Sequence, residues 1–204
     1  MSQPPAEVPK HILKLFESVD KKEKRRSPLR DPQDPAHWWR VLPNANSPWH
    51  SMPLGTIWDR PPNLSPRQAV NIAMHHLEAL GNLGIVSSNV QMYLGEGGPH
   101  GTRLFSRDEH VTGVTGKQFS KDHHLLPMFR LIGSHLLDYA NWVQDTRQKF
   151  FLFDIARPDQ YMYGTTVTLL HDEAILIDTD PFLAHATATQ INDFRDRADR
   201  MRHK

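Results

Sequence analysis

The chain contains no cysteine among its 204 residues. This absence excludes disulfide frameworks, thiolate zinc sites, thiol nucleophiles and iron–sulfur clusters. No apolar run approaches the roughly 20 residues that span a bilayer, and the opening MSQPPAEVPK lacks the charged and apolar regions of a signal peptide. We therefore expect a soluble, cytoplasmic protein that does not bind membranes.

The sequence also lacks an excess of charge of either sign. It has 24 Lys and Arg residues against 23 Asp and Glu residues, which gives a formal net charge of +1. Such a balance creates no overall attraction to nucleic acid or to anionic lipid, so any basic surface must be local. The length fits one domain, or one domain with a tail, and 38% hydrophobic residues are enough to build a core.

Proline is abundant at one end of the chain only. Residues 1–62 carry 11 of the 16 prolines, which remove backbone donors and restrict the residues that precede them. We therefore expect an N-terminal arm (residues 1–62), partly disordered, with one weak helix between Pro9 and Arg25. Residues 63–204 are expected to form a single domain.

Hydrophobic spacing in this domain predicts an α+β fold, in which about five mainly antiparallel strands are covered on one face by two long helices. The helices are expected from Ser65 to Gly81 or Gly84 and from Asp122 to Gln144. The strands are expected at 90–94, 102–106, 149–155, 165–170 and 174–178. Residues 107–121 have no clear period and are expected to form a mobile connection. A charged helix capped by Thr187 or Thr189 should fray at its end.

Tryptophan is concentrated in the arm. Trp38, Trp39, Trp49 and Trp58 lie within 21 residues, and disordered tails normally avoid exposing so much apolar area. Either these indoles wrap around the protein's own body, or they anchor a partner or a second copy together with Arg40. Both alternatives stay open at the level of sequence.

Histidine is unusually frequent, with 13 residues, and imidazole is a common metal ligand. His75 and His76 are neighbours on a helix, so one should face the core edge and the other water. No single helix places two histidines within reach of one ion. We expect no cofactor and no metal site, and any metal would need residues from several elements, such as His123, His124 and His171.

The string AILIDTDPF places Asp178 and Asp180 at a strand end, where magnesium and phosphate chemistry is often found. These nine residues resemble the first motif of haloacid-dehalogenase phosphatases, although Phe182 stands where that family prefers Thr or Val. The family also needs further strand–helix units downstream, whereas 24 residues follow Asp180. A looser alternative is a metal-dependent hydrolase or nuclease that uses Asp154 and His171 with these two aspartates.

A basic stretch in the arm supports a third alternative, an accessory factor that binds nucleic acid. Five positively charged residues are close together, and flexible basic runs contact phosphates without reading sequence. They are Lys21, Lys22, Lys24, Arg25 and Arg26.

The sequence therefore favours a non-catalytic interaction or assembly protein. We expect it to self-associate or to dock onto a larger complex, using the α+β domain and the Trp-rich arm. A protein partner or a homo-oligomer is expected, with nucleic acid as a further possible partner of the basic stretch.

Overall fold

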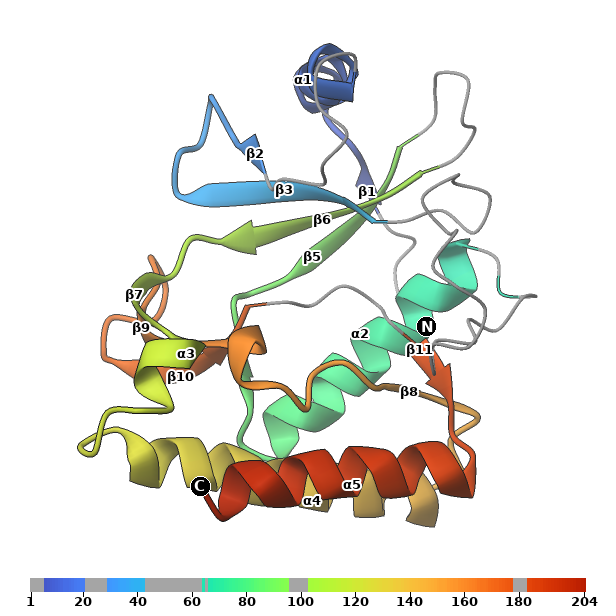
Figure 1. Ribbon diagram of the computed structural model, residues 1–204. Helices are drawn as coiled ribbons and strands as arrows, with labels where there is room; N and C mark the ends of the chain where they lie inside the picture. Colours follow the sequence, from blue (N-terminus) through green and yellow to red (C-terminus); the bar gives the residue numbers. More distant parts are fainter. Residues whose placement is uncertain (1–5, 21–28, 43–63, 65, 96–102, 178–182) are drawn as a thin grey trace.

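The computed structural model describes residues 6–20, 29–42, 64, 66–95, 103–177 and 183–204. Its helices and mainly antiparallel strands confirm the α+β class (Figure 1). None of the helices in these ranges is long and apolar enough to cross a membrane.

The helices agree well with the hydrophobic spacing of the sequence. They are α1 (Lys10–Asp20), α2 (Pro66–Asn82), the short α3 (Gly116–Phe119), α4 (Leu126–Asp145) and α5 (Ala188–Arg202), with a 3₁₀ turn, η2, at Pro158–Gln160. The cap predicted at Thr187 is confirmed, because its side chain accepts a hydrogen bond from the Gln190 N–H.

The strands are more numerous than the five expected, because eleven lie in the described parts of the chain and form three sheets. The first sheet has the order β1 (Ala6–Glu7), β5 (Gln91–Gly95), β6 (Arg103–Glu109), β3 (His37–Leu42) and β2 (Leu29–Arg30). The second sheet has the order β4 (Val86–Ser87), β10 (Glu173–Leu176), β9 (Tyr161–Thr165) and β7 (Thr112–Thr115). The third sheet pairs β11 (Leu183–His185) with β8 (Phe150–Leu152).

Two local predictions are wrong. Residues 107–121 are not a mobile connection, because they complete β6 and form β7 and α3, and β7 is held by antiparallel pairing with β9. The segment 165–170 is not a strand, because β9 ends at Thr165 and the chain turns immediately afterwards. Pairing with a distant strand forms β7 where the sequence shows no period, and local side-chain hydrogen bonds of Thr166 override the strand-like composition of 165–170.

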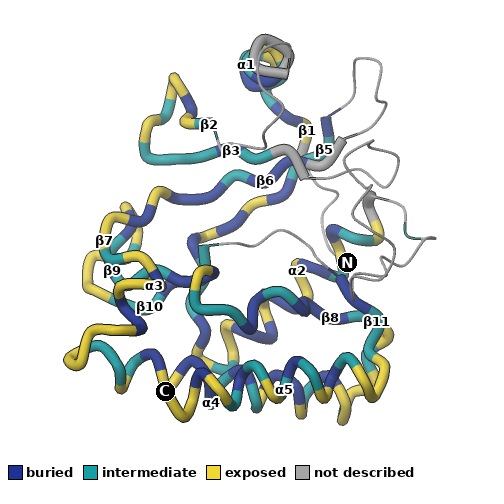
Figure 2. The backbone as a smooth tube through the Cα atoms, viewed as in Figure 1, coloured by how far each residue is buried: buried dark blue, intermediate teal, exposed yellow. Residues whose placement is uncertain are grey.

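The main core lies between α2, α4, α5 and the inner faces of the second and third sheets (Figure 2). Helices α4 and α5 pack closely at Gly133, where an added Cβ would lie 2.5 Å from the Arg202 nitrogen. The charged C-terminal helix α5 buries Phe194, Ala198 and Met201 on one face.

A second, smaller core lies between α1 and the first sheet. Its buried members are Val8, Ile12, Phe16, Trp39 and Phe105. Strand β3, which belongs to the predicted arm, pairs with β6 from His37 to Leu42. This part of the arm is therefore an integral strand of the first sheet.

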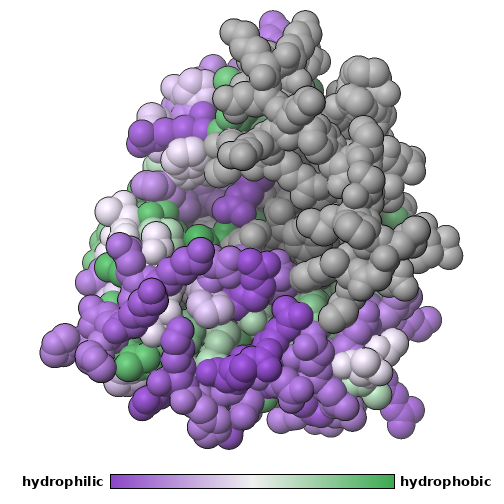
Figure 3. Space-filling view, viewed as in Figure 1, coloured by the Kyte–Doolittle hydropathy of each residue, from purple (hydrophilic) through white to green (hydrophobic). Residues whose placement is uncertain are grey.

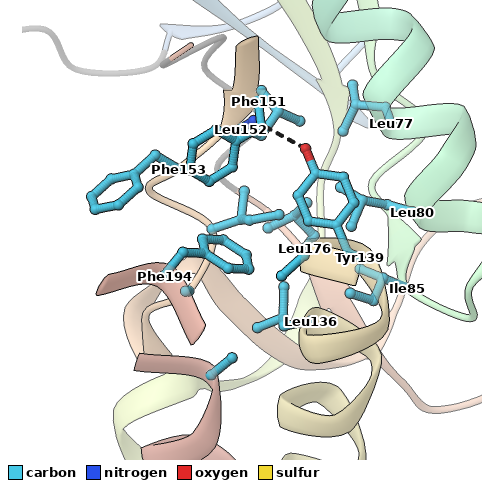
Figure 4. Packing of buried hydrophobic residues seen from close by; sticks show 14 of the residues in the cluster. Leu77, Leu80, Ile85, Leu136, Tyr139, Phe151, Leu152, Phe153, Leu176 and Phe194 are labelled. Atoms are coloured by element: carbon cyan, nitrogen blue, oxygen red, sulfur yellow. Dashed lines mark hydrogen bonds between the residues drawn. The ribbon is translucent and has the colours of Figure 1, made fainter. Parts of the chain in front are cut away.

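The adjacent histidines of α2 differ as the helical spacing predicted, because His76 is 0% exposed whereas His75 is exposed. His76 Nδ1 lies 2.7 Å from the Tyr139 hydroxyl, which accepts a hydrogen bond from the Leu152 N–H at 3.0 Å (Figure 4). The imidazole and the hydroxyl share one hydrogen bond, and the Phe150 backbone lies against the imidazole. This network ties α2 and α4 to β8. Burial, assisted by the charge of His75, lowers the pKa of His76 to about 4.

Candidate functional site

The turn between β9 and β10 (residues 166–172, the β9–β10 turn) exposes two large aliphatic side chains. Val167 is 54% exposed and Leu170 is 84% exposed. Figure 3 shows neutral and apolar groups, in white and green, on the left edge of the view where β7, β9 and this turn lie. The lower face over α4 and α5 is mainly hydrophilic in the same view. The turn is therefore an apolar feature on a largely polar surface.

The conformation of the turn is fixed by its own threonine. Thr166 Oγ1 accepts hydrogen bonds from the Leu169 N–H at 3.0 Å and from the Thr168 N–H at 3.3 Å. The Thr166 N–H donates to the Leu169 carbonyl at 3.0 Å. A threonine that bonds its own backbone in this way favours a turn over a strand, which explains why β9 ends at Thr165.

A buried carboxylate from the first sheet braces the turn from below. Glu109, the last residue of β6, is 3% exposed. Its Oε2 accepts from the Thr168 hydroxyl at 2.8 Å and the Thr168 N–H at 3.3 Å. Its Oε1 accepts from Asn89 Nδ2 at 2.8 Å, and Asn89 has a positive φ of 50°. Burial raises the pKa of Glu109, but the hydrogen bonds from Thr166, Asn89 and Thr168 outweigh it, so the pKa is lowered overall.

The hydrogen bonds from Thr168 to Glu109 can be tested by substitution. Glu109→Gln keeps the shape of the side chain but removes the negative charge, and hydrogen bonds to charged groups contribute about 1.5–3 kcal/mol. We expect the amides of Thr168 and Leu169 to exchange roughly tenfold faster in this variant, because the turn opens more easily. Amide hydrogen exchange by NMR measures this directly, with Gln118→Glu on α3 as a surface control. Unchanged exchange in the variant would mean that Glu109 does not hold the turn.

The carboxylate cluster expected around Asp154 is described only in part. Asp154 lies 3.2 Å from Arg157 Nη1 and accepts from Gln160 Nε2 at 3.2 Å. The Gln160 carbonyl accepts from the Ile177 N–H at 2.9 Å, and Ile177 is the last described residue before Asp178. Asp178 and Asp180 themselves lie outside the described residues.

Arg40 also contacts Ile177. Its Nη2 donates to the Ile177 carbonyl at 2.8 Å, and its Nε lies 3.4 Å from Asp108 Oδ2. Asp108 is 3% exposed. Arg40, predicted as a partner contact, therefore joins the first sheet to the end of β10 within this chain.

Arg157 forms ion pairs with both Asp154 and Asp159. Hydrogen bonding to Asp159 and the charge of Asp154 raise the pKa of Arg157, although burial opposes this. Burial raises the pKa of Asp159, but the Arg157 hydrogen bond and charge outweigh it, so the pKa is lowered overall. The lowered pKa of Asp159 favours its ionised form beside Arg157.

The histidines expected near Asp154 are not brought to it. His171 is exposed at the β9–β10 turn and lies 3.8 Å from Glu173. Strand β10, Glu173–Leu176, separates His171 from Ile177. His123 and His124 are exposed between α3 and α4. Within the described ranges no group of three or more His, Asp or Glu residues is placed to hold a metal ion.

The two described tryptophans of the arm have different surroundings. Trp39 is 1% exposed and its Nε1 donates to Asp31 Oδ2 at 2.9 Å, so its indole fills the protein's own core rather than a partner's groove. Trp38 is half-buried and donates to His110 Nδ1 at 2.7 Å near the surface. The predicted contacts Trp49 and Trp58 lie outside the described residues, as do Lys21, Lys22, Lys24, Arg25 and Arg26.

Sequence reasoning missed the residues that build the β9–β10 turn, namely Glu109, Val167 and Leu170. The string TTVTLL has the composition of a strand, and this hid the turn. The closely spaced Thr166 and Thr168 are a weak signal of a side-chain-capped turn, but nothing local reveals that Glu109 reaches them from 59 residues away.

Comparison with known proteins gives no relative on which to base a function. No protein-family model matches the chain, and no curated protein or solved structure resembles it significantly. The function is therefore inferred from the geometry of its own residues.

Proposed function

We propose that the protein is a non-catalytic interaction or assembly protein, which self-associates or docks onto a larger complex. The observation that carries this proposal is the pair of exposed aliphatic side chains, Val167 and Leu170, on a turn held by the buried Glu109. The buried carboxylate holds the exposed apolar side chains in one conformation, and this favours binding of a partner.

The energetics favour this use of the turn. Full burial of a valine or leucine side chain contributes about 1.5–3 kcal/mol, and 84% of Leu170 is available for burial. A flexible loop would lose conformational entropy when it binds, whereas a turn already fixed by Thr166 and Glu109 loses little. Rigid apolar anchors of this kind are typical of protein contact sites.

The surroundings of the other candidate residues also support an interaction protein over an enzyme. Asp154 is engaged by Arg157 and Gln160, as in a structural ion pair. His171 lies at the opposite end of β10 from Ile177. The half-buried Trp38, beside His110, is a second candidate anchor on the surface.

Site-specific photo-crosslinking tests the proposal in the full chain. Leu170→p-benzoylphenylalanine places a photoreactive ring at the turn, and irradiation in cells that produce the protein is expected to yield one dominant protein adduct. The matched control is Asp138→p-benzoylphenylalanine, which places the same ring at an exposed position on α4. We expect no comparable adduct from position 138.

Adding Val167→Ser to the crosslinking variant separates specific docking from chance encounter. If Val167 is part of the contact, this change should weaken the adduct by about tenfold, as expected when an anchor residue worth more than 1 kcal/mol is truncated. The absence of any adduct from position 170, or equal labelling from positions 138 and 170, would contradict the proposal.

A further inference from the structure

Strand β7 forms one edge of the second sheet, next to the β9–β10 turn. It pairs with β9 on one side, from Thr112 opposite Thr165 to Thr115 opposite Met162. Among the described residues no strand pairs with its other side. Thr112, Gly113 and Thr115 are exposed, so this edge is accessible.

The free backbone groups of β7 can be identified from its ladder. The Thr115 N–H lies 3.4 Å from Gln118 Oε1, so it is directed away from β9. Backbone groups alternate in direction along an antiparallel strand, so Gly113, two residues earlier, directs its N–H and C=O the same way. The Gly113 groups therefore face the open edge, where an added strand would bond to them, whereas the Thr115 N–H is already bonded to Gln118.

Strand β7 is short, and it lacks two other features that normally protect a sheet edge, charge and proline. Its sequence, Thr-Gly-Val-Thr, contains no charge and no proline. Gly113 faces Gly164 across the ladder, and a Cβ at Gly113 would lie 2.1 Å from the Tyr163 carbonyl oxygen. Gly113 therefore permits the close approach of β9, and it presents no side chain at the centre of β7.

We infer that β7 pairs in antiparallel fashion with β7 of a second copy of this chain, so that two second sheets join into one continuous sheet. This inference rests on the proposed function and identifies its partner. An antiparallel pair of identical strands has two-fold symmetry, which is the commonest symmetry of protein dimers. Main-chain hydrogen bonds supply the pairing, as in other cases of strand addition.

The charge of the molecule favours a second copy as the occupant. An uncharged strand is complementary to itself, because no like charges meet when two copies pair. The whole chain has a formal net charge of +1, and proteins near zero net charge repel one another weakly.

The β9–β10 turn lies at the end of the same ladder. Thr112 is paired with Thr165, the residue that directly precedes the turn. The turn that carries Val167 and Leu170 therefore follows the end of the β7–β9 ladder at which β7 begins.

Sedimentation velocity on the full chain tests the inference. We expect a monomer–dimer equilibrium that becomes populated between about 1 and 100 µM, the range of many reversible protein contacts. Thr112→Lys adds a charge to the open edge and should raise the dissociation constant by at least about tenfold. Thr189→Lys adds the same charge at the exposed start of α5 and should leave the dissociation constant unchanged.

Amide hydrogen exchange at two protein concentrations gives a second, independent measurement. In the dimer the Gly113 amide should become protected as concentration rises, whereas amides of α5 should not change. A matched thermal melt confirms that Thr112→Lys remains folded.

Two results would overturn the inference. The first is a monomer at 100 µM. The second is a dimer whose dissociation constant is unchanged by Thr112→Lys and in which the Gly113 amide gains no protection. The proposed function is tested separately, because a crosslink from position 170 to a different protein would leave it standing while removing the second copy as the partner.

Discussion

Trp39→Ala is expected to lower the free energy of unfolding by about 3–5 kcal/mol, the range measured for large aromatic side chains in cores. The indole of Trp39 is 1% exposed and packs against Tyr93, with ring centroids 4.9 Å apart. The substitution also removes the hydrogen bond to Asp31, a carboxylate that is 5% exposed. Loss of a donor to a buried charge adds to the cost of the cavity.

The adjacent tryptophan provides a matched control. Trp38 is half-buried and its indole bonds to His110 near the surface, so Trp38→Ala should cost about 1 kcal/mol or less. Urea unfolding of both variants measures the difference. Equal costs for the two substitutions would contradict the assignment of Trp39 to the core. If Trp38 contacts a partner, its variant should stay folded and lose binding.

The position of Trp39 also shows which features of the N-terminal segment local sequence patterns do not report. Prolines in residues 1–62 predicted little regular structure, yet Leu29 and Arg30 pair with β3, and β3 pairs with β6. The pairing of β3 with β6 joins residues that are 62 to 72 positions apart, from Leu42 with Leu104 to His37 with Glu109, and no local pattern reports it. The alternative that the indoles complete the protein's own core was correctly left open.

Long helices were predictable because their signals are local. The apolar spacing of α2 and α4, the proline in the first turn of each and the Thr187 cap of α5 all lie within the helix itself. Short strands were not predictable in this way. Strand β7 has four residues without strong alternation, and it exists because β9 is beside it.

The candidate site was harder to predict than the fold, because its parts come from separate sheets. Glu109 ends β6, and its targets follow β9. The sequence attracted attention to Asp154 and His171, since carboxylates at strand ends and histidines are common in catalytic sites. In the structure Asp154 forms an ion pair with Arg157, and His171 lies at the β9–β10 turn beside Glu173.

The stability of the main core should depend on pH through His76. Its pKa is lowered to about 4, whereas an unfolded histidine has a pKa near 6.5. The unfolded chain therefore binds more protons between these values, and stability is full above about pH 6.5 and is lost as the pH falls toward 4. One pKa unit corresponds to about 1.4 kcal/mol, so we expect a loss of roughly 2 kcal/mol by pH 5 and roughly 3 kcal/mol by pH 4.

His76→Phe tests this origin of the acid sensitivity, with His75→Phe on the exposed neighbour as its control. At pH 7.5 the first variant should lose about 1–3 kcal/mol, because the Tyr139 hydroxyl loses its hydrogen bond to the imidazole in the core. Between pH 7.5 and pH 5 its stability should then change by less than about 0.5 kcal/mol, since no buried imidazole remains to be protonated. His75→Phe should keep most of the pH dependence of the parent protein.

Urea unfolding at pH 7.5, 6 and 5 distinguishes the two variants. Carboxylates with lowered pKa values, such as Asp31 and Glu109, do not interfere, because they lose their contribution to stability only at more acidic pH. An equally steep pH dependence in His76→Phe would show that another group is responsible for it.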